Sequence, residues 1–203
     1  KRPYDAVELA RSLYAESIPF NLRIIGNGVE FAGVQEAVKA AGLSGRVEML
    51  GSKGPDEVKS AMAESDVFLF TSDYREGWGA VLNEAMGCGT AVVASHACGS
   101  TNFLIRHGVN GLIYPCGCIE SLQRQVRLLA IDGDLRIRLG RAARETVHGE
   151  WGAHSAASRL LELSDSIVGK RANPFTAGPC SKAYDISNEE AEAAVFDSMK
   201  RQD

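Results

Sequence analysis

The sequence predicts an α/β fold built on a doubly wound parallel sheet of the Rossmann-like kind. Two short runs, 67–70 (VFLF) and 91–94 (AVVA), are apolar at every position, as in strands that are buried on both faces. Segments with helical spacing alternate with such runs, which favours a parallel sheet covered by helices on both sides. Ligands of doubly wound folds bind outside the carboxyl ends of the strands. The candidate site loops are therefore 26–29, 51–54, 71–79 and 95–101.

Each predicted strand is a short, mostly apolar run that ends at a glycine or a polar residue. The run NLRII ends at Gly26-Asn27-Gly28, and the run VEML ends at Gly51. The pair Gly26 and Gly28 resembles the start of a dinucleotide-binding motif, but the third glycine is missing, so a structural turn is the favoured interpretation. The predicted strands are 21–25, 47–50, 67–70, 91–94 and 111–114.

The predicted helices carry apolar residues three or four positions apart, or recognisable start and stop signals. Leu9, Ala10 and Leu13 mark the apolar face of the first helix. Pro55 suits the first turn of the third helix, and Gly42 ends the second. The predicted helices are 4–16, 30–41, 55–64, 79–87, 118–130, 132–147 and 153–167.

The composition is that of a globular domain without a strongly charged surface. The 203 residues are 45% hydrophobic, and the net charge of −4 excludes nucleic acid and anionic membranes as main partners. No apolar run approaches the ~20 residues that span a bilayer, and the start lacks the apolar region of a signal peptide. The odd number of cysteines, five, fits free thiols in the cytoplasm. We expect surface or packing roles for the four scattered histidines.

No metal site is expected. Cys116 and Cys118 are spaced C-x-C, with neither a second cysteine pair nor a histidine at zinc-finger spacing. The chain also lacks an acidic D-x-D cluster. We therefore expect no metal and no cofactor besides a substrate.

The segment 71–95 (TSDYREGWGAVLNEAMGCGTAVVAS) is the part of the chain best suited to chemistry. A buried strand ends at Phe70, a polar loop with Gly77-Trp78-Gly79 follows, and a helix then begins. Glycine lets a backbone approach a ligand closely. The free N–H groups at a helix start favour an anion such as a diphosphate. This pattern predicts a phosphate-binding loop.

Two acids flank that helix start. Glu84 has apolar neighbours in AVLNEAM, and a partly buried carboxylate there needs hydrogen-bond donors such as the two hydroxyls of a ribose. Glu76 lies at the loop tip, placed for a ligand group beyond the phosphates. Two acids at this spacing are common, and most helix acids are solvated. The context of buried strand, Gly-aromatic-Gly and helix is what favours a site.

The stretch EGWGAVLNEAMGCGTAVVAS closely resembles the E-G-F-G-x-x-x-x-E-A-M-A-x-G-x-P-V-V-A-S signature of glycosyltransferase family four. The segments LRIIGNG, RVEMLG and NGLIYPCG are also similar to strands and turns of that family. The resemblance covers about residues 1–168 and is most specific at 66–115. It implies the C-terminal, donor-binding half of a GT-B glycosyltransferase, with the first strand of its sheet and the acceptor-binding half absent.

The resemblance also implies a role for particular residues. Glu84 should bind the nucleotide ribose, and Glu76 should bind hydroxyls of the donor sugar and be required for catalysis. Lys1 is the candidate for a lysine that clamps the diphosphate. The helix-start positions that meet the diphosphate and sugar are Gly77, Trp78, Gly79, Ala80 and Val81. The turn that helps to hold the base corresponds to Gly51, Ser52 and Lys53.

The sequence departs from the family pattern at two places near the signature. Asn102 occupies a position that is often acidic, and Ala91 replaces a proline. Neither change touches Glu76 or Glu84. The side chain of Trp78 has two open interpretations, packing or lining the sugar pocket, whereas Trp151 is expected in the core.

The implied function is retaining transfer of a hexose from a nucleotide sugar, with UDP as the favoured nucleotide, to a hydroxyl acceptor in polysaccharide biosynthesis. We expect a cytoplasmic protein whose missing N-terminal half completes the active enzyme and carries any peripheral membrane association. The alternatives are a non-catalytic nucleotide-sugar-binding module and a GT-B epimerase or glycogen-synthase relative. A flavodoxin-like signalling domain is disfavoured, because Asp66 and Asp73 lack the context of a phosphoacceptor.

From about Gly169 the composition changes. The segment GKRANPFTAGPCSK is rich in proline and glycine and predicts a linker. Residues 188–201 predict a terminal helix with acids in its first turn. We expect one domain over 1–168, followed by a linker and a terminal helix over 169–203 that is partly disordered.

Overall fold

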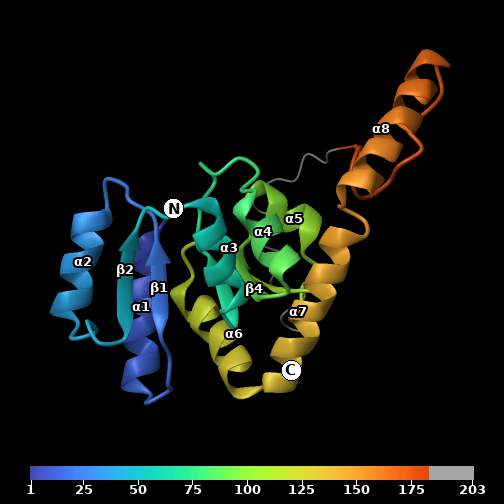
Figure 1. Ribbon diagram of the computed structural model, residues 1–203. Helices are drawn as coiled ribbons and strands as arrows, with labels where there is room; N and C mark the ends of the chain where they lie inside the picture. The colour runs from blue at the N-terminus through green and yellow to red at the C-terminus, as the bar shows by residue number, and fades with distance from the viewer. Residues whose placement is uncertain (183–203) are drawn as a thin grey trace.

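The computed structural model describes residues 1–182 and has an α/β architecture with parallel strands (Figure 1). The terminal helix expected at 188–201 lies outside the described residues. The strands are β1 (Leu22–Ile25), β2 (Val47–Gly51), β3 (Val67–Phe70), β4 (Ala91–Ser95) and β5 (Leu112–Tyr114). The helices are α1 (Pro3–Ala15), α2 (Phe31–Ala40), α3 (Pro55–Ala63), α4 (Val81–Cys88), α5 (Gly99–Leu104), α6 (Ile119–Ile131), α7 (Gly133–His148) and α8 (Ala153–Val168). Among them, none has the length and apolarity to cross a membrane.

The predicted α/β fold class is confirmed, and within the described residues the strands form two hydrogen-bonded groups. One group pairs β1 with β2, and the other has the order β3-β4-β5, with every pair parallel. In the part of the chain that the structure describes, helix α5 is the one element that the sequence did not predict. Its sequence, GSTNFL, contains glycine and small polar residues of low helix propensity and no apolar period.

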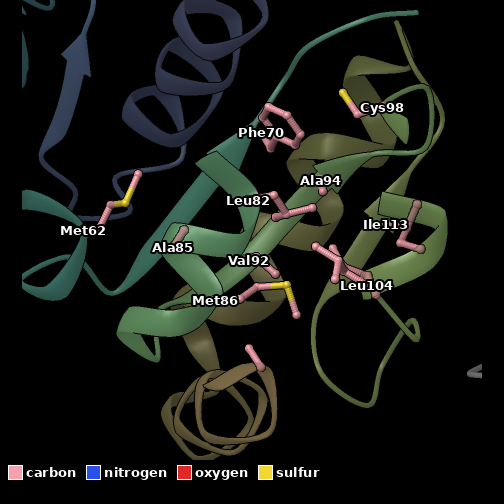
Figure 2. Packing of buried hydrophobic residues seen from close by; sticks show 12 residues of the cluster. Met62, Phe70, Leu82, Ala85, Met86, Val92, Ala94, Cys98, Leu104 and Ile113 are labelled. Atoms are coloured by element: carbon pink, nitrogen blue, oxygen red, sulfur yellow. The ribbon is translucent and has the colours of Figure 1, made fainter. Parts of the chain in front are cut away.

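Strand β4 is buried on both faces, as its apolar sequence predicts. Val92 and Ala94 pack with Leu82 and Met86 of α4, which Figure 2 shows beside them. Val93 faces the opposite side and packs in a second cluster, to which α1, α6 and α7 contribute. Alternate residues of β4 thus belong to different halves of the core. Both faces of this strand are therefore covered along its whole length.

Helix α1 spans the two groups of strands. Val7 and Ala10 pack with the residues of β1, β2 and α2, whereas Leu9 and Leu13 pack with those of β4, β5 and α6. On the other face, Arg23 of β1 donates hydrogen bonds to the carbonyl of Ala61 at the end of α3 and to the hydroxyl of Ser65. The same two helices therefore join β1–β2 to β3–β4–β5.

Helix α8 extends away from the body of the molecule (Figure 1). Only Ser166 of this helix is buried. The segment after it folds back along the helix, where Arg159 donates to the carbonyl oxygens of Ala177 and Pro179 and lies over the ring of Phe175. Arg159 therefore orders the described part of the predicted linker.

Candidate functional site

The loop between β3 and α4 runs along the carboxyl edge of the sheet. Thr71 and Ser72 are buried, and the loop reaches α4 through Gly79, whose φ is +78°. A Cβ at Gly79 would lie 2.4 Å from the Phe70 ring, so the close approach of the helix start to β3 requires glycine here. Helix α4 begins at Val81, two residues after the predicted start.

Glu76 lies on this loop and is paired with the first residue of the chain. The Lys1 ammonium lies 2.5 Å from its carboxylate, and the Ser72 hydroxyl donates to the same oxygen at 3.4 Å. The carbonyl of Lys1 accepts a hydrogen bond from the Thr71 hydroxyl. The structure thus brings together Lys1 and Glu76, which are 75 positions apart, and confines the carboxylate, whose side chain is 21% exposed.

Arg2 reinforces the position of Lys1. Its guanidinium donates two hydrogen bonds to Asp5, at 2.7 and 3.1 Å, and Asp5 is buried. The backbone of Arg2 is left-handed, with φ at +44°, a conformation that costs energy for a residue other than glycine. The ion pair with Asp5 offsets that cost and fixes the chain as it enters α1. No sequence motif predicts this arrangement of Arg2 and Asp5.

Cys98 lies buried beneath the Glu76 loop. Its thiol contacts the carbonyl oxygen of Ser72 at 3.3 Å. Burial, together with the negative charge of Glu76, raises the pKa of this thiol to about 12. Cys98 is therefore a protonated packing residue near neutral pH, not a nucleophile.

Glu84 differs from its sequence-based interpretation. It lies in the first turn of α4, nearer the helix start than the sequence predicted, and its side chain is exposed. The expectation of partial burial is wrong because α4 turns Leu82, Ala85 and Met86 toward the sheet, as Figure 2 shows, and leaves Glu84 on the outer side. Burial therefore gives no reason to expect ligand hydroxyls at Glu84. Its place in the first turn of α4 is still compatible with a hydrogen bond from a ligand bound at the helix start.

The start of α4 is open to an anion. Among the described residues, no side chain caps this helix end, and the position before it is Ala80. The amide of Leu82 donates to the carbonyl of Gly79, but no side-chain acceptor of the kind that caps most helices meets the amides around this helix start. A phosphate group would complete these hydrogen bonds and would interact favourably with the helix dipole.

Helix α5 holds the other side of the loop through backbone hydrogen bonds. The amide of Gly99 donates to the carbonyl of Gly77, and that of Ser100 donates to the carbonyl of Trp78, both at 3.0 Å. In these two hydrogen bonds the loop supplies only carbonyl acceptors. They therefore involve none of the N–H groups at the start of α4.

The side chain of Trp78 packs against other aromatic residues. Its ring centroid lies 5.6 Å from those of both Phe103 and Trp151, and its indole N–H donates to Asn83. Of the two interpretations of Trp78, packing is the one that these contacts support. Trp151, expected in the core, is half-buried at the edge of this cluster.

The residues predicted for the base-binding turn lie at the end of β2. Gly51 has a φ of +65°, and its carbonyl accepts a hydrogen bond from the amide of Gly26, which joins the turns after β1 and β2. Ser52 is exposed. The Lys53 ammonium is paired with Glu57 at 3.0 Å. This ion pair directs Lys53 toward α3.

An open groove of about 450 Å³ lies between α3 and the β1–β2 pair. Lys53 is the one residue that it shares with the predicted site, since neither Glu76 nor Glu84 lines it. The mixed charges of its walls are largely paired with each other, as in Arg23 with Glu64. We therefore place the candidate site at the loop before α4. Within the described residues, no cluster of acidic, histidine or cysteine side chains is arranged to hold a metal.

Comparison with known proteins gives a consistent result. Residues 1–146 match the family described as "Glycosyl transferases group 1". The chain is 30% identical over 168 residues to N-acetyl-alpha-D-glucosaminyl L-malate synthase of Bacillus anthracis, covering 83% of this chain and 43% of that protein. It is 31% identical over 142 residues to the lipopolysaccharide core biosynthesis glycosyltransferase LpsE of Rhizobium meliloti, covering 70% of this chain and 41% of that protein.

Among solved structures, Anabaena Alr3699/HepE in complex with UDP superimposes with a TM-score of 0.72 at 23% sequence identity. The match covers 82% of this chain and 45% of that protein. The same protein has been solved with UDP-glucose. The chain thus spans about two fifths of the length of these curated relatives.

Proposed function

The chain belongs to the group 1 glycosyl transferases, and from that membership we propose that it binds the nucleotide-sugar donor of a hexosyltransferase at the loop between β3 and α4. The observation that carries the proposal is the open start of α4 beside the Glu76–Lys1 pair. An anion-binding helix end, a cation and a carboxylate there provide separate partners for the phosphates and for the sugar.

The division of roles follows from charge and position. The amides of residues 77–81 and the Lys1 ammonium offset the negative charge that the diphosphate gains as the glycosidic bond breaks. The Lys1 ammonium has three donors, so it can keep Glu76 and still donate to a phosphate oxygen. Glu76 accepts hydrogen bonds from hydroxyls of the donor sugar and orients it. Glu84 accepts from the ribose hydroxyls.

The base is held by the turn after β2, at Gly51, Ser52 and Lys53. This assignment is supported by the position of the turn at the carboxyl edge of the strands. To bind the nucleotide, Lys53 must break its ion pair with Glu57. The cost in free energy is small, because exposed ion pairs of this kind contribute little to stability.

We propose retention of configuration, a mechanism of the family-four type and UDP as the nucleotide, supported by the signature at 76–95 and by the UDP complexes of the Anabaena protein. A role in polysaccharide biosynthesis is supported by the Rhizobium relative, which is named as a lipopolysaccharide core biosynthesis glycosyltransferase. We further propose that the acceptor site lies in a second half, because the chain spans only two fifths of its relatives, and that this chain alone does not catalyse transfer. Five free cysteines fit a cytoplasmic setting.

Calorimetric titration of the whole protein with UDP and with GDP tests the donor site. We expect the Glu84→Ala variant to lose about 1.5–3 kcal/mol of binding free energy, the scale of a hydrogen bond to a charged group. The Glu36→Ala variant is the matched control, because Glu36 is an exposed acid on α2. Equal nucleotide affinity in the wild type and Glu84→Ala would remove Glu84 from the site, and no affinity for either nucleotide in the wild type would refute the proposed function.

A further inference from the structure

Lys1 reaches the proposed donor site from an unfavourable piece of backbone. The next residue, Arg2, has a φ of +44° and a ψ of 54°, in the left-handed region that residues other than glycine rarely adopt. Arg2 also precedes Pro3, and a residue before proline favours extended backbone. If nothing opposed it, the backbone at Arg2 would relax toward the extended region and redirect Lys1.

Asp5 opposes this relaxation through three hydrogen bonds. Its buried carboxylate accepts from Nε and Nη2 of Arg2, at 2.7 and 3.1 Å, and its backbone amide donates to the Arg2 carbonyl at 3.2 Å. The guanidinium also lies against the turn after β5, where a Cβ on Gly117 would be 3.5 Å from Nη2. Relaxation at Arg2 would move the guanidinium away from Asp5 and leave a buried carboxylate without its charged partner, which is costly.

Thr71 holds the same stretch of chain from the sheet. It is the residue that follows β3, it is buried, and its hydroxyl donates to the carbonyl of Lys1 at 3.1 Å. That carbonyl belongs to the peptide group that joins Lys1 to Arg2, so Thr71 and Asp5 fix the chain on both sides of the strained φ angle. The Lys1 side chain is 71% exposed, and it still pairs with Glu76 at 2.5 Å.

We infer that Asp5 and Thr71 are positioning residues of the donor site, which place Lys1 where it can bind the diphosphate without contacting the donor themselves. The inference rests on the proposed function, in which the Lys1 ammonium donates to a phosphate oxygen. A free lysine side chain loses conformational freedom when it binds a ligand. Fixing the backbone beneath Lys1 in advance lowers that cost and so raises the affinity for the nucleotide.

The test measures the affinity of the whole protein for UDP, and in parallel for GDP, by calorimetry. Asp5→Asn keeps the size of the side chain but loses the charge that holds Arg2, and Thr71→Val keeps the shape but loses the hydroxyl. Each variant should weaken nucleotide binding about threefold to tenfold, because Lys1 is then no longer held in place. Glu8→Gln removes an exposed ion pair from the same helix and is the control, which should bind as the wild type does.

A double-variant cycle with Lys1→Ala separates positioning from general stability. If Asp5 acts through Lys1, adding Asp5→Asn to Lys1→Ala should produce no further loss of nucleotide affinity. Arg2→Gly should restore most of the affinity that Asp5→Asn loses, because glycine adopts a positive φ without a contact to hold it there. A role of Asp5 in stability alone predicts no such rescue.

Wild-type affinity in Asp5→Asn, in Thr71→Val or in Lys1→Ala would overturn the inference, and so would additive losses in the cycle or the absence of rescue by Arg2→Gly. In each of these outcomes the wild type still binds the nucleotide, so the proposed function stands. If Asp5→Asn does not fold, the same cycle with Thr71→Val and Lys1→Ala decides the question. A wild type that binds neither UDP nor GDP would overturn both the inference and the proposed function.

Discussion

The amide of Gly99 donates a hydrogen bond to the carbonyl of Gly77 at 3.0 Å, and a Cβ on Gly99 would lie 2.3 Å from that same oxygen. Helix α5 can approach the loop before α4 only because this residue has no side chain. The contact joins two neighbouring connections at the carboxyl edge of the sheet. It also explains how a short helix of low intrinsic propensity contributes to the proposed donor site.

Gly99→Ala should therefore displace the loop as well as lower stability. We expect a loss of about 1–3 kcal/mol in the free energy of unfolding, typical of overpacking, because the clash is with backbone that cannot rotate away. Nucleotide affinity should fall with it, since the loop carries the amides proposed to meet the diphosphate. Denaturant unfolding and calorimetry measure the two effects. Gly45→Ala is the control, because a Cβ at Gly45 meets no atom within 4 Å and should leave both quantities unchanged; a Gly99→Ala protein as stable as this control would contradict the packing argument.

Glu76→Gln tests the proposed sugar contact without changing the size of the side chain. We expect the rate of hexose transfer by the whole protein to fall by about a hundredfold or more, the effect of losing charged hydrogen bonds to the sugar. Affinity for the free nucleotide should stay the same. Steady-state transfer assays and calorimetry with UDP separate these effects.

The control for Glu76→Gln is Glu8→Gln, which also removes an ion pair. Glu8 pairs with Arg11 at 3.0 Å, and both side chains are exposed, so its loss should change neither rate nor affinity. Transfer by Glu76→Gln at the wild-type rate would exclude Glu76 from catalysis.

Within residues 1–182, local sequence patterns predicted every strand and all helices except α5, because these elements carry their own apolar period or terminal signals. The loop before α4 could be identified in the same way from Gly77, Gly79 and the buried strand before it. Long-range contacts could not be predicted from local patterns. The pairing of Lys1 with Glu76, the packing of Trp78 on Trp151 and the bond between His96 and Tyr74 depend on how the strand ends come together.

The exposure of Glu84 shows the limit of composition as a guide to burial. Most neighbours of Glu84 in the sequence are apolar, but side chains next to one another on a helix point in different directions. Leu82, Ala85 and Met86 are buried, whereas Glu84 is exposed. Only the orientation of α4 on the sheet determines which residues of a mostly apolar helix face solvent.

His107 should make the stability depend on pH between neutrality and mild acid. Its Nδ1 accepts from the amide of Ile113 at 2.9 Å, and its Nε2 is buried without a hydrogen-bond partner among the described residues. Burial lowers the pKa of this histidine from its ordinary value of about 6.5. The unfolded chain therefore binds a proton that the folded chain does not, so stability is complete above about pH 6.5 and falls as the pH drops toward the folded pKa.

The measurement is the free energy of unfolding at a series of pH values from neutral to about 5. His107→Asn retains an acceptor for the Ile113 amide and should flatten the dependence, whereas His154→Asn, at an exposed position, should not. Salt bridges and hydrogen bonds lower the pKa of Glu16, Glu57 and Asp73, so their contributions to stability are lost only at more acidic pH. Parallel curves for the wild type and His107→Asn would exclude His107 as the source.

The edges of β1 and β3 provide a test of how the domain is completed in the whole protein. The amides of Leu22 and Gly26 donate toward β2 and its preceding turn, so by alternation the amides of Arg23 and Ile25 point to the other edge of β1. Within the described residues β1 does not pair with β3, although α1 and α3 pack against both groups of strands. The family resemblance implies a first strand that this chain lacks, and we propose that in the whole protein this strand inserts between β1 and β3.

Hydrogen exchange measures this directly. In residues 1–182 alone, the amides of Arg23 and Ile25 should exchange much faster than that of Ile24, which points toward β2. In the whole protein all three should be protected, because the inserted strand would accept the hydrogen bonds of the first two. Unpaired edges of this kind also promote association, so the shorter chain should self-associate more readily. Fast exchange at Arg23 and Ile25 in the whole protein would mean that the gap between the two groups of strands is not filled by a strand.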